Sequence, residues 1–117
     1  MKTILGLSFI ILALGACSTK NTMYYWGHYE PLIYESYRNP GKIPPEQQIE
    51  KLQEDKQKAL SKNKRMPPGF HAYLGTLYFQ TQKLFEAQHE FEIEKTEYPE
   101  SAVFMDRLID NAKGKTK

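Results

Sequence analysis

The sequence predicts an all-α fold with an aromatic N-terminal helix, an antiparallel pair of helices and a C-terminal helix that covers the pair. Apolar side chains recur at intervals of three or four residues, the spacing that lines one face of a helix. Turn-forming residues separate these stretches, most clearly in NPGKIPP (39–45). The segment from Pro45 to Lys64 has no glycine or proline inside it, as a continuous helix requires.

The chain begins with a segment typical of a secretory signal. One cation, Lys2, precedes an apolar run from Ile4 to Leu14, and small residues follow up to Cys17. The apolar run has eleven residues, whereas a helix needs about 20 to cross a bilayer. We therefore expect residues 1–16 to be a signal peptide rather than a membrane-spanning helix.

The residues before Cys17 resemble the lipobox of bacterial lipoproteins, in which small side chains fit a narrow peptidase site. The resemblance implies that the signal is cut before Cys17, that this residue carries a diacylglycerol thioether, and that its new amine is usually acylated. Residues 17–23 would then form a lipidated tether. Two or three acyl chains anchor a protein firmly, whereas one chain does so only marginally. Because Cys17 is the single cysteine, no internal disulfide can form, and the alternative is a secreted protein with a free thiol.

Ser18, rather than an aspartate, follows Cys17. In Gram-negative lipoproteins this pattern is similar to that of proteins sorted to the outer membrane, which implies a lipid-anchored domain facing the periplasm if the host is Gram-negative. The remaining chain, a helical domain over 24–113 and a basic tail over 114–117, is long enough for one small core. With 16 Lys and Arg against 14 Asp and Glu, the charge gives no electrostatic case for nucleic acid.

The segment from 23 to 37 holds five of the eight tyrosines and the single tryptophan. One helical stripe in it contains Trp26, Tyr29, Ile33 and Tyr37. We favour a structural role, in which this stripe supplies apolar surface to the core of the domain. Two other interpretations stay open, namely contact with the membrane interface and a binding surface. The candidate interaction residues of this segment are Tyr24, Tyr25, Trp26, Tyr29, Tyr34 and Tyr37.

The next segment, from Pro45 to Lys64, is expected to form a polar helix. Prolines stand at its start, where a missing N–H costs no helical hydrogen bond. Its thin apolar stripe consists of Ile49, Leu52, Ala59 and Leu60.

The thirty-four residues 68–101 have the length of a tetratricopeptide (TPR) repeat. They resemble the pattern of that family, with its relative spacings, at Leu74, Gly75, Tyr78, Ala87, Phe91 and Pro99. The resemblance implies two antiparallel helices that cross closely at Gly75 and Ala87. His71 stands where tryptophan is usual and Glu94 where a small residue is usual, which puts the stacking of a further repeat in doubt.

A third helix follows the repeat, in the place where TPR proteins cover the exposed face of their last repeat. Ser101 is its expected N-cap, and its apolar face contains Phe104, Leu108, Ile109 and Ala112. The first helix of a TPR hairpin lines the concave surface, so the resemblance adds three candidates for contact, Tyr73, Thr76 and Gln80. A single repeat cannot bury its apolar face, so upstream segments, a second copy or another protein must complete the core.

The order of a lipobox, a YxWGxYE box (24–30), an LIY element and a TPR-like hairpin resembles an uncharacterised family of small bacterial lipoproteins, known as a domain of unknown function. Genes of that family often lie beside a lipoprotein similar to the curli secretion channel. The resemblance implies a role in an outer-membrane assembly, with such a lipoprotein as a candidate partner. It implies no catalytic activity.

The sequence has no recognisable catalytic or cofactor motif. HEFEI (89–93) lacks the second histidine of the H-E-x-x-H zinc motif, and Glu86 with His89 gives one Glu-x-x-His where a di-iron bundle needs two. We expect no metal and no cofactor. The acidic residues here are expected to form a solvated helix face, with Glu92 pairing with Lys95; they are Glu86, Glu90, Glu92, Glu94 and Glu97.

These observations predict a non-catalytic interaction or scaffold module, lipid-anchored in the outer membrane, within an envelope assembly or a secretion-associated complex. We expect a protein partner in the envelope, and a homo-oligomer is compatible with the sequence. The alternative is a small enzyme acting on peptidoglycan, or an activator of cell-wall synthesis, with aromatic rings stacked on sugars and glutamates as acid and base. That chemistry requires two carboxylates across a cleft, about 5–9.5 Å apart.

Overall fold

The structure of the protein is a computed structural model, and it describes residues 22–115. This part of the chain contains helices, no strand and one isolated bridge between Tyr24 and Arg65, so the predicted all-α fold is confirmed. The helices are α1 (Tyr29–Arg38), α2 (Pro45–Ser61), α3 (Phe70–Gln80), α4 (Leu84–Glu97), a 3-10 turn (Pro99–Ser101) and α5 (Ala102–Lys115). The predicted signal peptide, Cys17 and most of the tether lie outside the described residues. No helix within 22–115 is long and apolar enough to cross a membrane.

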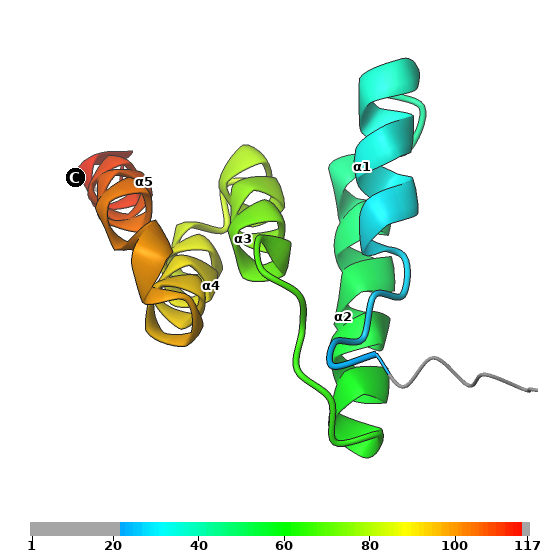
Figure 1. The fold of residues 1–117 in the computed structure, drawn as a ribbon. Coiled ribbons are helices and arrows are strands. Elements are labelled where there is room, and N and C mark those ends of the chain that lie inside the picture. The colour runs from blue at the N-terminus through cyan, green and yellow to red at the C-terminus, as the bar shows by residue number, and fades with distance from the viewer. Residues whose placement is uncertain (1–21, 116–117) are drawn as a thin grey trace, which may run out of the picture.

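Helices that follow one another in the sequence also lie side by side (Figure 1). α1 lies along α2, α3 follows, and α4 and α5 continue toward the opposite end of the molecule. The backbone N–H of His28 donates to Asp55, and Ser36 donates to Gln48. The start of α1 therefore lies against the second half of α2 and its end against the first half, so these two helices are antiparallel.

The α3–α4 pair crosses closely at Gly75. A methyl group built on Gly75 would lie 2.5 Å from a ring atom of Phe91, which is closer than real side chains approach. Leu74, Ala87 and Phe91 are almost completely buried around this crossing. Helix α4 then ends two residues before Pro99, which cannot continue a helical hydrogen-bond pattern.

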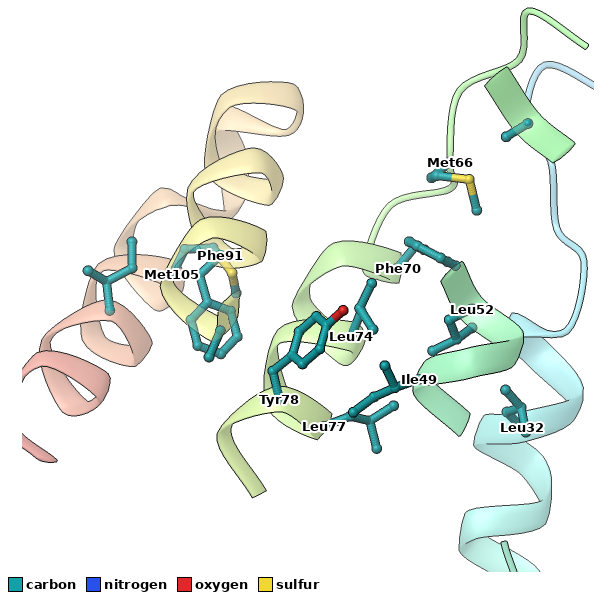
Figure 2. Close-up of a cluster of buried hydrophobic side chains, with 13 residues drawn as sticks. Leu32, Ile49, Leu52, Met66, Phe70, Leu74, Leu77, Tyr78, Phe91 and Met105 are labelled. Carbon is teal, nitrogen blue, oxygen red and sulfur yellow. The ribbon is translucent and has the colours of Figure 1, made fainter. Parts of the chain in front are cut away.

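The hydrophobic core runs from α1 to α5 rather than ending at the α3–α4 pair (Figure 2). Its buried apolar side chains are Leu32, Ile49, Leu52, Ala59, Met66, Phe70, Leu74, Leu77, Tyr78, Ala87, Phe91, Met105 and Ile109. In Figure 2, Ile49 and Leu52 of α2 point toward α3. The upstream segments of the same chain therefore cover the apolar face that an isolated helical pair would leave open.

The face of α1 that meets the core differs from the predicted one. Leu32 is buried, whereas Tyr37 is 87% exposed and Trp26 is 39% exposed. The prediction that the stripe with Trp26 and Tyr37 fills the core is wrong at both of these residues. The physical reason is a set of hydrogen bonds to α2. His28 and Ser36 lie on the same side as Leu32, and both hydrogen-bond to residues of α2. Those bonds turn the Leu32 side inward and leave the aromatic side facing outward.

Two other side chains predicted to be apolar contacts are exposed, Leu60 at the end of α2 and Phe104 near the start of α5. In α5 the inward position is taken by Met105, which is almost completely buried. Ser101 directly precedes α5, but its hydroxyl donates to the carbonyl groups of Glu94 and Tyr98 instead of accepting from the helix N–H groups. α5 also continues to Lys115, past the predicted start of the tail at 114.

Two acidic side chains of α4 lie in the interior, so the prediction of a solvated face is wrong for them. Glu90 is 3% exposed and lies 2.6 Å from both His71 Nδ1 and Lys56 Nζ. Burial raises the pKa of Glu90, but the hydrogen bonds from His71 and Lys56 outweigh it and hold that pKa below its ordinary value. Glu94 is buried as well and accepts a hydrogen bond from the Gly69 N–H at 2.7 Å. Both carboxylates are inside because their partners come from other helices and loops.

An exposed ion pair joins α4 to α5. Lys95 Nζ lies 2.6 Å from Asp106 Oδ1, so the described partner of this lysine is Asp106 rather than the predicted Glu92. The hydrogen bond to Asp106 raises the pKa of Lys95. Because solvent surrounds both groups, the pair adds little to stability.

Candidate functional site

A groove opens along the outer side of α1 and reaches α3. One hollow of about 470 Å³ is lined by Trp26, Tyr29, Glu30, Ile33, Tyr34 and Tyr37. A second hollow of about 460 Å³ is lined by Ile33, Ser36, Tyr37, Pro40 and Tyr73. The two hollows share Ile33 and Tyr37, so they form one continuous surface, which we call the aromatic groove.

The Tyr73 end of the aromatic groove has a polar floor. The Tyr73 hydroxyl donates to Gln48 Oε1 at 2.5 Å and lies 3.0 Å from Ser36 Oγ. The Gln48 amide in turn donates to the carbonyl of Ile43 at 2.8 Å, which ties the 39–45 loop to the same network. Because these groups bind one another, the floor holds the shape of the groove and the aromatic walls remain available.

The start of α1 is held by a buried carboxylate. Asp55, which is 0% exposed, accepts hydrogen bonds from the backbone N–H of His28 at 2.6 Å and from its Nδ1 at 2.9 Å. A carboxylate at this place also complements the positive end of the α1 dipole. The preceding residue, Gly27, has a φ of +47°, and a methyl group there would lie 2.3 Å from the Asp55 carboxylate. The glycine of the WG pair is therefore required both by its backbone angle and by the carboxylate beside it.

Aromatic rings connect this end of the groove to α3. The rings of Trp26 and Tyr29 are stacked with an interplanar angle of 20° and centroids 6.5 Å apart. Tyr29 also meets Phe70 at 5.7 Å and Tyr73 at 6.0 Å. Burial, with the nearby charge of Glu94, raises the pKa of Tyr29 to about 12. Tyr29 thus remains a neutral phenol at physiological pH, and its ring supports Trp26 at the surface.

Six of the predicted interaction residues meet in the groove and in the adjoining hollow, Trp26, Tyr29, Tyr34, Tyr37, Tyr73 and Gln80. Tyr24 and Tyr25 do not. The N–H of Tyr25 donates to the carbonyl of Arg65 at 2.8 Å, and the ring of Tyr24 lies 6.4 Å from that of Tyr98. These two tyrosines therefore hold the segment before α1 against the loop before α3 and the end of α4.

The candidates on α3 do not share one face. Tyr73 and Gln80 lie on the α1 side, in hollows that touch the 39–45 loop. Thr76 instead lines a small hollow of about 70 Å³ between α3, α4 and α5, and its hydroxyl donates to the carbonyl of Ala72 at 2.9 Å. The structure therefore separates Thr76 from the aromatic groove.

Sequence reasoning did not identify Glu30, Ser36 and Pro40 as parts of the site. Glu30 lies one helical turn before Tyr34 on α1 and four residues after Trp26, so the spacing of the aromatic stripe could have placed it there. Ser36 lines the groove from within α1, whereas Pro40 lines it through the fold of the 39–45 loop. Nothing in a local pattern of spacing indicates that contact.

A separate hollow of about 390 Å³ lies between α2 and α4, outside the aromatic groove. It is lined by Gln53, Lys56, Tyr78, Phe85, Glu86, His89 and Glu90. Its buried members are already engaged, since Glu90 binds Lys56 and the Tyr78 hydroxyl receives a hydrogen bond from Gln53. Among the side chains of residues 22–115, no group of three or more His, Cys, Asp or Glu is arranged to hold a metal ion. The hollow is a polar surface around an internal ion pair.

The fold and the groove together define an all-helical domain with an exposed aromatic groove along α1. The chain belongs to the family described as a domain of unknown function, DUF4810, whose model matches residues 23–108. The match includes the aromatic groove, the α3–α4 pair and the first half of α5. No curated protein and no solved structure matches the chain.

Proposed function

We propose that the protein is a non-catalytic interaction module that binds another envelope protein through the aromatic groove. The observation that carries this proposal is the exposure of Trp26, Tyr34 and Tyr37 along one side of α1. Large rings left in water are unfavourable for an isolated chain, and tyrosine and tryptophan are enriched where proteins bind each other. A partner that covers these rings would recover that free energy.

The location of the module rests on the sequence. The signal segment and the lipobox support export and lipidation at Cys17, and Ser18 supports the outer membrane. A tether of a few residues would keep the domain within reach of other membrane-anchored proteins. The candidate partner is a protein of the same envelope, such as a lipoprotein similar to the curli secretion channel, or a second copy of this chain. The close α3–α4 crossing at Gly75 supports a TPR-like scaffold role.

The placement of the acidic residues favours binding over catalysis. A glycan-cleaving site needs two carboxylates free to act across a cleft. Glu90 is occupied by His71 and Lys56, and Glu94 is buried with one of its oxygens bound by the Gly69 N–H. In the aromatic groove, Glu30 is the one carboxylate among the lining residues described.

Photocrosslinking in intact cells tests the proposed function. A photoreactive amino acid replaces Tyr37 in one variant and Phe104 in another, because Phe104 is exposed at 59% but lies on α5, away from the groove. We expect a defined protein adduct from position 37 and none from position 104. Absence of an adduct at position 37 in lipidated, folded protein would contradict the proposal.

Lipidation is tested separately with a palmitate analogue in cells. Replacing Cys17 with alanine removes the thiol that the lipobox resemblance assigns to the acyl chain. We expect labelling of the natural chain and none of Cys17→Ala. Persistent labelling of the variant would refute the assignment.

A further inference from the structure

The dimensions of the aromatic groove suit an extended peptide. Helix α1 has ten residues and is therefore about 15 Å long. A polyproline II strand rises about 3.1 Å per residue, so about five residues in that conformation span the helix. The groove is open along its side, which allows a chain to lie in it without threading.

The chain already places proline against these tyrosines. Pro40 lines the groove together with Tyr37 and Tyr73. Pro44, in the same loop, has φ −58° and ψ 149°, close to the polyproline II conformation. One end of the groove thus combines a proline with two tyrosines in its lining, and the Trp26 end is lined by aromatic residues without a proline.

The rim of the groove offers more hydrogen-bond donors than it satisfies. Within residues 22–115 no group accepts from the indole N–H of Trp26 or from the hydroxyl of Tyr37. The Tyr34 hydroxyl accepts from Arg38 at 3.3 Å, which leaves its own proton to donate. A ligand rich in carbonyl groups and poor in N–H groups matches this rim. Proline-containing backbone has that composition, because proline lacks the N–H.

Charge differs between the two ends of the groove. Glu30 lies at the Trp26 end and is the charged residue among those that line the two hollows. At the other end Arg38 lies 6.0 Å from the centre of the Tyr34 ring. A ligand with a basic group beside Glu30, and none beside Arg38, fits this distribution.

We propose that the aromatic groove binds an extended, proline-containing peptide segment of a partner protein, about five residues long, with an arginine or lysine beside Glu30. This peptide-binding inference rests on the function proposed above, and it adds the chemistry of the partner segment that the groove binds. Prolines pack between the aromatic rings, carbonyl groups of the segment accept from Trp26 and Tyr37, and its cation pairs with Glu30. The preformed shape of a proline segment lowers the entropy lost on binding.

Trp26 provides the readout, because it is the only tryptophan of the chain and lies in the groove. The full lipidated protein, in detergent micelles, is titrated with the peptides acetyl-RAPPLPP-amide and acetyl-APPLPPR-amide, which carry arginine at opposite ends. We expect a saturable change in Trp26 fluorescence with at least one of them. Peptides of the same charge with every proline replaced by alanine are expected to bind at least tenfold more weakly.

Variants separate the contacts. Tyr37→Ala is expected to weaken peptide binding roughly tenfold, as removal of a central aromatic contact does at other interfaces. In the natural chain the arginine peptide should bind more tightly than the same peptide with norleucine in place of arginine. Glu30→Gln is expected to reduce this ratio of affinities about two- to fivefold. Phe104→Ala, on α5, is expected to bind as the natural chain does. Because Tyr37 is 87% exposed, its replacement leaves the fold intact, which circular dichroism checks.

Three results would overturn the inference. The first is equal binding of the proline peptides and their alanine versions, or no saturable binding of either. The second is a response to the N-acetylglucosamine tetramer alone, which would make the groove a glycan site. The third is quenching of Trp26 by brominated phosphatidylglycerol vesicles, which would place the groove on a lipid surface. If position 37 still crosslinks to a protein in cells, only the peptide chemistry is wrong; if crosslinking fails too, the proposed function falls with it.

Discussion

Two sides of α3 use aromatic rings in opposite ways. On the α4 side, Phe91 lies against Gly75 with no room for a methyl group between them. On the α1 side, Tyr73 lines a groove whose other wall includes Tyr34 and Tyr37, and these are 62% and 87% exposed. The first contact is closed within the chain, and the second is open. We infer that the closed side, between α3 and α4, determines the stability of the fold. The open side, between α3 and α1, determines binding.

The largest expected effect lies in the charged interior on the closed side. Glu90→Ala leaves His71 buried and Lys56 without its carboxylate, and removing one partner of a buried pair costs about 3–5 kcal/mol. Urea unfolding followed by circular dichroism measures this loss. Glu86→Ala, one turn away and exposed, is the matched control and should stay within about 0.5 kcal/mol. A loss below about 1 kcal/mol for Glu90→Ala would show that the pair does little for the fold.

The close crossing gives the next largest effect. Gly75→Val places side-chain atoms where Phe91 stands, so we expect a loss of about 2–3 kcal/mol in the free energy of unfolding. Gly114→Ala is the control, since nothing lies within 4 Å of the added methyl group. That change should be neutral or stabilise by up to about 1 kcal/mol, because alanine favours a helix. Equal stability of Gly75→Val and the natural chain would contradict the close packing.

Lowering the pH should reduce the free energy of unfolding through protonation of Glu90, on the closed side. Its pKa in the folded chain lies below the ordinary value of 4.5, so its ionised form is stabilised by folding. That contribution is present above pH 4.5 and is lost as the pH falls through the lower folded pKa. Unfolding midpoints measured from about pH 6 to about pH 3, roughly 1.5 units above and below 4.5, should fall less steeply for Glu90→Gln than for the natural chain. Identical slopes for the two proteins would refute this assignment.

The smallest effect on stability is expected on the open side. Tyr37→Ala removes an exposed ring, so the free energy of unfolding should change by about 0.5 kcal/mol or less. Peptide binding should nevertheless weaken roughly tenfold, as the groove proposals require. A stability loss above about 2 kcal/mol would instead make Tyr37 part of the folding core.

The sequence predicted the closed side well. The spacing of Leu74, Gly75, Ala87 and Phe91 predicted two helices that meet at a small residue; Gly75 lies directly against Phe91, and Leu74 and Ala87 are buried. Such a contact is predictable because both halves of it are encoded within one short segment. The helical character of the segments on either side followed from the same local spacing and from the turn residues between them.

On the open side, the local spacing of residues could not predict which face of α1 is buried. Helix α1 has two faces that could be buried, the aromatic one with Tyr37 and the mixed one with Leu32. Hydrophobicity favoured the aromatic face, but His28 and Ser36 find their partners on α2, distant in sequence, and turn the mixed face inward. Glu90 was misplaced for the same reason, because its partners come from α2 and α3. Polar pairs between residues distant in sequence therefore determine which face of α1 is buried and why Glu90 is inside, and the local periodicity of the sequence does not reveal them.

The most direct test of the division between the two sides is recovery of the partner from detergent-solubilised membranes. The tagged natural chain is compared with Tyr37→Ala and with Phe104→Ala. Both variants remove an exposed ring, but of the two residues Tyr37 lies in the aromatic groove and Phe104 does not. We predict that the protein crosslinked at position 37 co-purifies with the natural chain and with Phe104→Ala, and is lost with Tyr37→Ala. Equal recovery with all three, or recovery of the monomer alone under conditions that keep known envelope complexes intact, would contradict the account.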